Sequence, residues 1–230
     1  MKILQVLAEI YETPSILERE VPDILAFLSA KCGKKGQSLS NNIPMHEACF
    51  ADLLNKNGFL FLNKNIAPLL GYPCYHHQLG GNHTKVDFVL YETVGTCIVS
   101  VKFDLKHTNT KTFYLNDGWF HTDTIYIINW TLKKKHSVLI ACGNEIPTKD
   151  EESEMRELLE LKKRLNTEQN NVGSLVKYIR FANQYKCDMF TPEFAESRFQ
   201  SVSAFLSSMS QPSESASQEQ HSQSALPPKD

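Results

Sequence analysis

Two short runs of β-branched and aromatic residues, separated by a turn, constrain the fold more than any other feature of the sequence. The runs are Val86–Tyr91 (VDFVLY) and Cys97–Phe103 (CIVSVKF), and Glu92–Thr96 (ETVGT) joins them. Runs of this composition on either side of a glycine-containing turn predict a β-hairpin. Two similar runs, Thr124–Trp130 and Ser137–Cys142, predict the next strands of the same sheet.

Amphipathic patterns on both sides of these strands predict helices. Apolar residues recur at helical spacing over residues 1–12, 14–31, 44–57, 150–165, 173–186 and 192–208. Pro22 lies inside the second pattern and is expected to divide it. Residues 66–83 contain several prolines and glycines and predict an irregular stretch. Strands and helices in this order indicate an α/β protein.

The chain divides into three parts by composition. We expect an N-terminal helical segment over residues 1–43 and one α/β domain with C-terminal helices over residues 44–208. Residues 209–230 consist mostly of Ser, Gln, Glu and Pro, which cannot build a hydrophobic core. We therefore predict a disordered tail there.

The overall composition narrows the class of protein. No apolar run approaches the roughly 20 residues that a membrane helix needs, so no membrane span is expected. The N-terminus is interrupted by glutamates and does not read as a signal peptide. The six cysteines form no CxxC pair and are expected to be reduced thiols, which predicts a cytoplasmic or otherwise intracellular protein. The net charge of −2 argues against coating of nucleic acid by bulk charge but leaves room for a local basic groove.

The predicted hairpin brings acidic and basic side chains to one face of the sheet. Side chains alternate along a strand, so Ser100, Lys102 and Asp104 share a face of the second strand. A two-residue turn at Val94–Gly95 would place Asp87 opposite Lys102, and a four-residue turn would place Asp87 opposite Ser100. The two registers differ by an even number, so Asp87 faces the same side as Lys102 in both.

A carboxylate and a lysine at the ends of paired strands suit the hydrolysis of phosphodiesters. Carboxylates hold Mg²⁺, which keeps several waters and binds phosphate oxygens. The metal stabilises charge on the phosphorus and activates a bound water. A nearby ammonium orients that water and stabilises charge as well.

The order of these residues resembles the PD-(D/E)XK nuclease superfamily, and most closely its type II restriction endonucleases. The resemblance covers roughly residues 44–130 and rests on Glu47 in HEACFADLLNKNGF, Asp87 in KVDFVLY and Lys102 in IVSVKFD. It implies a central mixed sheet flanked by helices. It also implies Mg²⁺-dependent cleavage of DNA, with Mn²⁺ as a possible substitute, by a protein that acts as a homodimer. Asp87 and Glu47 match metal-binding positions of that family, and Lys102 matches its lysine.

Ser100 stands where most members of the family carry the acid of the lysine motif. Serine is a poor metal ligand beside a carboxylate, and either Asp104 or Glu47 can compensate for it. Two other functions stay open: a non-catalytic nucleic-acid-binding or assembly subunit, and a nuclease of repair or recombination that reads DNA structure. The simplest alternative is an exposed ion pair between Asp87 and Lys102.

Polar residues around the hairpin are candidates for contact with DNA. They lie before the first strand and after the second: His83, Lys85, Lys106, His107, Asn109 and Lys111. A plain polar loop is the competing interpretation. The stretch CYHHQLGGNH at residues 74–83 is rich in Cys and His, but its spacing matches no familiar zinc site.

Overall fold

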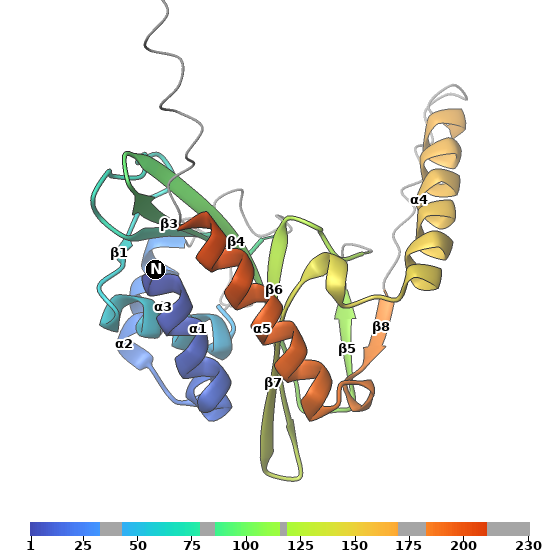
Figure 1. Ribbon diagram of the computed structural model, residues 1–230, viewed down its shortest axis with the longest axis horizontal. Helices are drawn as coiled ribbons and strands as arrows, with labels where there is room; N and C mark the ends of the chain where they lie inside the picture. The colour runs from blue at the N-terminus through green and yellow to red at the C-terminus, as the bar shows by residue number, and fades with distance from the viewer. Residues whose placement is uncertain (33–42, 79–85, 116–118, 170–182, 211–230) are drawn as a thin grey trace, which may run out of the picture.

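The computed structural model describes residues 1–32, 43–78, 86–115, 119–169 and 183–210 (Figure 1). Its centre is a mixed six-stranded sheet in the order β1-β2-β3-β4-β6-β7. The strands are β1 Leu60–Phe61, β2 Cys74–His77, β3 Phe88–Val94, β4 Cys97–Thr108, β6 Thr124–Leu132 and β7 Lys135–Cys142. A second, two-stranded sheet joins β5 Thr112–Leu115 to β8 Asn183–Lys186. The α/β class and the mixed sheet flanked by helices are therefore confirmed.

The helices occur on both sides of the strand region in the sequence. They are α1 Lys2–Glu12, α2 Pro22–Cys32, α3 Met45–Lys56, α4 Lys149–Gln169 and α5 Pro192–Met209, with 3₁₀ turns at Pro14–Glu18, Gly143–Glu145 and Cys187–Met189. Pro22 does divide the second predicted helix, because the segment before it is a 3₁₀ turn and α2 begins at the proline itself. No helix in the described part of the chain is long and apolar enough to cross a bilayer.

Strands β3 and β4 form the predicted hairpin, but in neither predicted register. Gly95 has φ +59°, and the pairing closes at Val94 and Cys97, so the turn consists of Gly95 and Thr96. Val89, and not Asp87, lies opposite Lys102. Continuing this register by one residue brings Asp87 level with Asp104. The two strands are thus shifted by two residues from the nearer prediction, which preserves the face but changes every partner.

Two further expectations about local structure are wrong. Residues 183–186 belong to strand β8 and not to a helix, because Tyr185 packs into an aromatic cluster against Phe113 and Phe120. The remaining residues of that predicted helix, 173–182, lie outside the described ranges. The expected irregular stretch over residues 66–83 contains β2, whose four residues are all buried and pair with β3. The tail from residue 211 onward also lies outside the described ranges.

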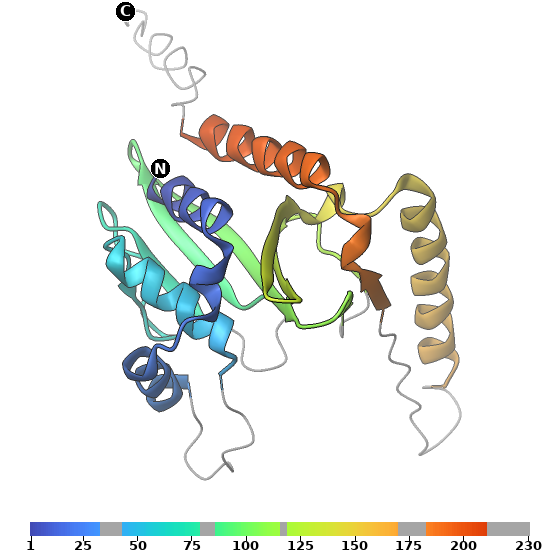
Figure 2. The ribbon, with the colours of Figure 1, turned by 90° about the horizontal axis from the view of Figure 1, so that it is seen from below.

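Two hydrophobic clusters occupy the two faces of the sheet. The larger one packs α1, α3 and α5 against Phe88, Leu90, Val101, Phe103 and their neighbours in β6 and β7 (Figure 2). The smaller one packs the β5–β8 ribbon and the start of α5 against the alternate residues of β6 and β7. Alternation along the central strands therefore supplies side chains to both clusters.

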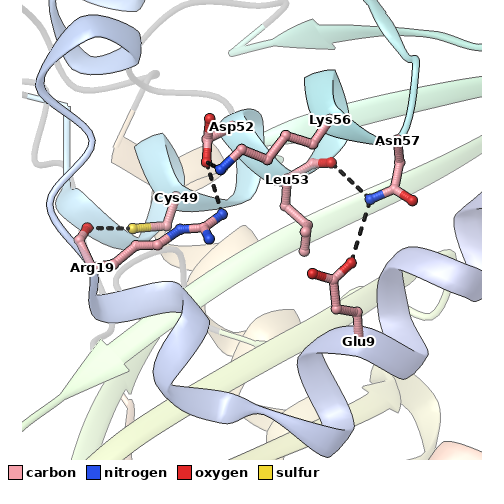
Figure 3. Close-up of polar contacts among 7 residues, drawn as sticks. All are labelled: Glu9, Arg19, Cys49, Asp52, Leu53, Lys56 and Asn57. Carbon is pink, nitrogen blue, oxygen red and sulfur yellow. Dashed lines mark hydrogen bonds and ion pairs between the residues drawn. The ribbon is translucent and has the colours of Figure 1, made fainter.

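The N-terminal helical region packs on α3, the helix that begins with Glu47. Arg19 and Lys56 both form ion pairs with Asp52, at 2.7 and 2.8 Å (Figure 3). The thiol of Cys49 donates a hydrogen bond to the carbonyl oxygen of Arg19 at 2.9 Å. Residues of α1 and α3 also share the larger hydrophobic cluster. The ion pair with Arg19, the Cys49 hydrogen bond and the shared apolar contacts thus hold α3 against the N-terminal region.

A carboxylate of the N-terminal region also binds the far edge of the sheet. Glu18 Oε1 accepts hydrogen bonds from Asn129 Nδ2 at 3.1 Å and from the Thr131 hydroxyl, and it lies 3.0 Å from His136 Nδ1. Burial by itself raises the pKa of Glu18, but the hydrogen bonds from Thr131, His136 and Asn129 lower this pKa below the usual 4.5.

The lowered pKa of Glu18 predicts a pH-dependent contribution to stability. Its stabilisation is present above about pH 4.5 and is lost as the pH falls through the lower folded-state pKa. We expect Glu18→Gln to reduce the free energy of unfolding by about 1 kcal/mol at pH 6. At pH 3 the difference from wild type should shrink. Urea unfolding at both pH values measures it, with Glu12→Gln, an exposed glutamate, as control. An equal loss at the two pH values would contradict the assignment.

Candidate functional site

Two aspartates and a lysine meet where β3 begins and β4 approaches its end. Asp104 and Lys106 alternate along β4 and so project from the same face. Lys106 Nζ lies 2.5 Å from Asp104 Oδ1, and their side chains are 25% and 9% exposed. The carboxyl group of Asp87 lies near that of Asp104 and interacts with it electrostatically. Asp87 Oδ2 also accepts a hydrogen bond from the backbone N–H of Leu105 at 2.7 Å.

Glu47 approaches this group from the first turn of α3. Its Oε2 lies 2.6 Å from His77 Nε2, in a pair whose two side chains are almost fully buried. Gln78 Nε2 donates a second hydrogen bond to the same oxygen at 3.3 Å. Glu47 interacts electrostatically with Asp87 and with Lys106. Residues from a helix, from the end of β2 and from the hairpin thus form one buried polar site.

Burial raises the pKa values of the acids in this site. Burial, together with the neighbouring Asp87, raises the pKa of Asp104 well above its usual value, although Lys106 opposes the shift. Burial and Asp87 likewise raise the pKa of Glu47 against the opposing effect of His77. Burial and the neighbouring carboxyl group of Asp87 therefore favour the protonated forms of Asp104 and Glu47.

Lys106 is the cation of the site. Burial lowers the pKa of an ammonium group, but the carboxylates of Asp104, Asp87 and Glu47 outweigh this effect and raise the pKa of Lys106. Lys106 is therefore positively charged at neutral pH. As a charged ammonium it donates hydrogen bonds and stabilises negative charge, and it does not act as a base.

Two histidines border the site on its α3 side. The rings of His46 and His107 stack with their centroids 5.6 Å apart. Burial, with the nearby charges of His107 and Lys106, lowers the pKa of His46 to about 4. His46 is thus neutral near pH 7, when its ring can donate and accept hydrogen bonds without adding charge.

Lys102 and Ser100, which were predicted to complete the site, have other neighbours. Lys102 Nζ is 2.5 Å from Asp123 Oδ2, and the two side chains are 44% and 61% exposed. Ser100 is exposed and pairs with Tyr91 across the hairpin. The expected pairing of Asp87 with Lys102 or Ser100 is therefore wrong. The physical reason is the two-residue shift in register, which moves Asp104 and Lys106 to the level of Asp87.

The residues predicted to contact DNA that the structure describes have different surroundings. Lys106 belongs to the buried site and His107 borders it, where His107 Nε2 contacts Asn109 Oδ1 at 3.0 Å. Lys111 is exposed and forms an ion pair with Asp188 at 3.2 Å. His83 and Lys85 lie outside the described residues.

The sequence contained a signal for this arrangement. Asp104, Leu105 and Lys106 themselves read Asp-x-Lys, the spacing that places an acid and a lysine on one face of a strand. The motif lies two residues beyond the one centred on Ser100 and Lys102. Both candidates share the same face, so only the strand register distinguishes them.

The donor chemistry of the site fits a divalent cation bound together with a substrate. Among the described residues no three His, Cys, Asp or Glu side chains converge into a ready-made metal cage. Mg²⁺ commonly binds one or two carboxylates and completes its shell with waters and phosphate oxygens. Asp87 and Asp104 supply those two carboxylates.

The histidine side chains of strand β2 do not converge on one site. His76 and His77 project to opposite faces, since they are neighbours in a strand. His77 binds Glu47, whereas His76 Nδ1 lies 3.2 Å from the Tyr91 hydroxyl and its Nε2 contacts carbonyl oxygens of Asn63 and Ile66. Both histidines therefore serve the polar packing of this edge of the sheet.

Comparison with known proteins adds no relative. No protein-family model matches the chain, and no curated protein and no solved structure is significantly similar to it.

Proposed function

We propose that this protein is a Mg²⁺-dependent nuclease that hydrolyses DNA phosphodiester bonds. Its catalytic site would consist of Asp87, Asp104 and Lys106. One observation supports the proposal above all others. Two neighbouring aspartates and a charged lysine come together at the ends of paired strands, with Glu47 beside them. The lysine of the PD-(D/E)XK resemblance is accordingly assigned to Lys106 and its acid to Asp104.

Each side chain has a distinct role in this proposal. Asp87 and Asp104 bind the cation, which when present stabilises charge on the phosphate and makes a bound water more nucleophilic. Lys106, fixed by Asp104, donates hydrogen bonds that orient the attacking water and stabilise the developing negative charge. Glu47, held by His77, adds negative charge that strengthens cation binding. The carboxyl group of Glu47 interacts electrostatically with that of Asp87.

The sharpest form of the proposal is a restriction-type enzyme that cleaves at a specific sequence. A nuclease that recognises branched DNA uses the same chemistry and differs only in its substrate. Discrete fragments from linear plasmid DNA support the first form, and preferential cleavage of a four-way junction supports the second.

Removal of one carboxylate tests the chemistry. Asp87→Asn keeps an oxygen that accepts the hydrogen bond from Leu105 N but loses the charge. We expect cleavage of supercoiled plasmid in Mg²⁺ or Mn²⁺ to fall by about 100-fold or more. Cleavage by the wild type should also stop when EDTA removes the metal.

Asp123→Asn is the matched control, because Asp123 is an exposed aspartate outside the site. This variant should cleave at the wild-type rate. Metal-independent cleavage, or equal rates for wild type and Asp87→Asn, would contradict the proposal. Binding of DNA without cleavage in any metal would favour the non-catalytic subunit instead.

A further inference from the structure

Helix α4 extends away from the rest of the molecule. Both views show it standing apart from the central sheet, joined to it near its N-terminal end (Figures 1 and 2). Thr148 caps this end: its hydroxyl accepts a hydrogen bond from Glu151 N at 3.3 Å, and its backbone N–H donates to Glu151 Oε2 at 2.7 Å. Met155 is buried, but most of residues 156–165 are exposed. A well-defined helix therefore presents its surface to solvent.

An apolar stripe runs along this exposed helix. Leu158 and Leu161 are 42% and 40% exposed, and Leu165 follows four residues later. Spacings of three and four residues place these leucines on one face. Leu159, at the side of the stripe, is 38% exposed. Leucines in this spacing on a helix are the usual signature of a helix–helix contact.

The charges of α4 differ between its two halves. Residues 149–160 carry six acidic side chains and two basic ones, Lys149 and Arg156; the acids are Asp150, Glu151, Glu152, Glu154, Glu157 and Glu160. Residues 161–169 carry the basic run Lys162, Lys163 and Arg164 and one acid, Glu168. A parallel partner of the same sequence would align acid with acid. An antiparallel partner aligns the acidic half of one helix with the basic half of the other.

We propose that α4 pairs in antiparallel orientation with α4 of a second copy of this chain. The leucine stripe lies near the middle of the helix, so a two-fold axis close to Leu161 places the stripes of both copies together. The charge pattern is self-complementary about the same axis. This is the isologous contact that a two-fold dimer requires. The proposal is independent of the nuclease function.

Glu157 and Arg164 make the pairing specific. They are seven residues apart and directly precede Leu158 and Leu165, so they lie on the same flank of the stripe. Antiparallel pairing about an axis between Glu160 and Leu161 sets Glu157 opposite Arg164 of the second copy. The two-fold axis repeats this pair, so each dimer contains it twice.

Sedimentation of the full chain tests the dimer. We expect the wild type to sediment with twice the mass of the 26.2-kDa chain at tens of micromolar. Leu158→Glu combined with Leu161→Glu should weaken dimerisation by roughly 30-fold or more. Both leucines are exposed, so the helical circular dichroism and the Tm should stay close to those of the wild type. Ser203→Glu, on α5, is the control and should leave the dimer intact.

Charge reversal provides the decisive comparison. Glu157→Arg alone and Arg164→Glu alone each place like charges together and should weaken the dimer. An equimolar mixture of these two variants should form a heterodimer, because both opposed pairs then regain opposite charges. A monomeric wild type at 100 μM, a dimer that the leucine variant leaves unchanged, or a mixture that associates no better than either variant alone would overturn the proposal.

Discussion

Lys106→Met is expected to reduce DNA cleavage by about 10²- to 10⁴-fold, whereas Lys102→Met should retain nearly full activity. The two lysines lie four residues apart on the same face of β4. Lys106 is mostly buried beside Asp104, and Lys102 is 44% exposed beside Asp123. Asp104 holds the ammonium of Lys106 within the candidate site, whereas Asp123 holds that of Lys102.

Initial rates on supercoiled plasmid in Mg²⁺ measure this difference. Methionine preserves the length and the apolar stem of lysine, so both variants should fold. DNA binding, measured by fluorescence anisotropy in Ca²⁺, should survive in the Lys106 variant better than cleavage does. Loss of activity in Lys102→Met with retention in Lys106→Met would reject the assignment and return the role to Lys102.

Phe50→Ala is expected to cost about 3–5 kcal/mol of the free energy of unfolding. Phe50 is fully buried on α3, and its ring contacts Phe88 edge-to-face with centroids 4.9 Å apart. The centroid of Phe103 lies 5.9 Å away. Domains of this kind are stable by about 5–15 kcal/mol, so the loss is a large part of the total.

The same substitution should also disturb the positions of Asp87 and Asp104, because their neighbours in the strands pack on Phe50. Phe88 directly follows Asp87, and Phe103 directly precedes Asp104. The cavity left by Phe50 should therefore allow the backbone at both acids to move. Urea unfolding measures the stability, with Phe205→Ala as control, because Phe205 is 44% exposed on α5. The control should cost less than about 1 kcal/mol. Equal losses in the two variants would contradict the central role of Phe50.

The secondary structure that depends on local pattern was predicted well. The first hairpin strand, β6, β7, α3 and α5 appear within a few residues of their expected bounds, and the second hairpin strand begins at Cys97 as expected but continues to Thr108. Local pattern did not reveal β2, which has four residues and depends on pairing with β3. It also suggested a helix where β8 forms. The preference of residues 183–186 for a strand comes from distant partners in β5, which a local window cannot include.

The candidate site was predicted in part. Glu47, Asp87 and Asp104 were chosen because carboxylates at strand ends suit a divalent cation, and the structure brings them together with Lys106. The predicted register paired Asp87 with Lys102 or Ser100, whereas the structure places Lys106 beside Asp104. Two lysines on one face of β4 satisfy the same alternation, so the pattern could not separate them. His77 and Gln78, which hold Glu47, were not predicted because β2 was not recognised as a strand.

The sequence by itself determined the α/β class, the hairpin and the face on which the acids project, because these follow from side-chain periods of 2 and 3.6 residues. The tertiary structure alone decided which residues meet. A two-residue change in register leaves the periodic pattern intact, so no pattern distinguishes Lys102 from Lys106. Turn geometry at Gly95, pairing with β2 and the packing of Phe50 select the register together, and these contacts join residues that are distant in the chain.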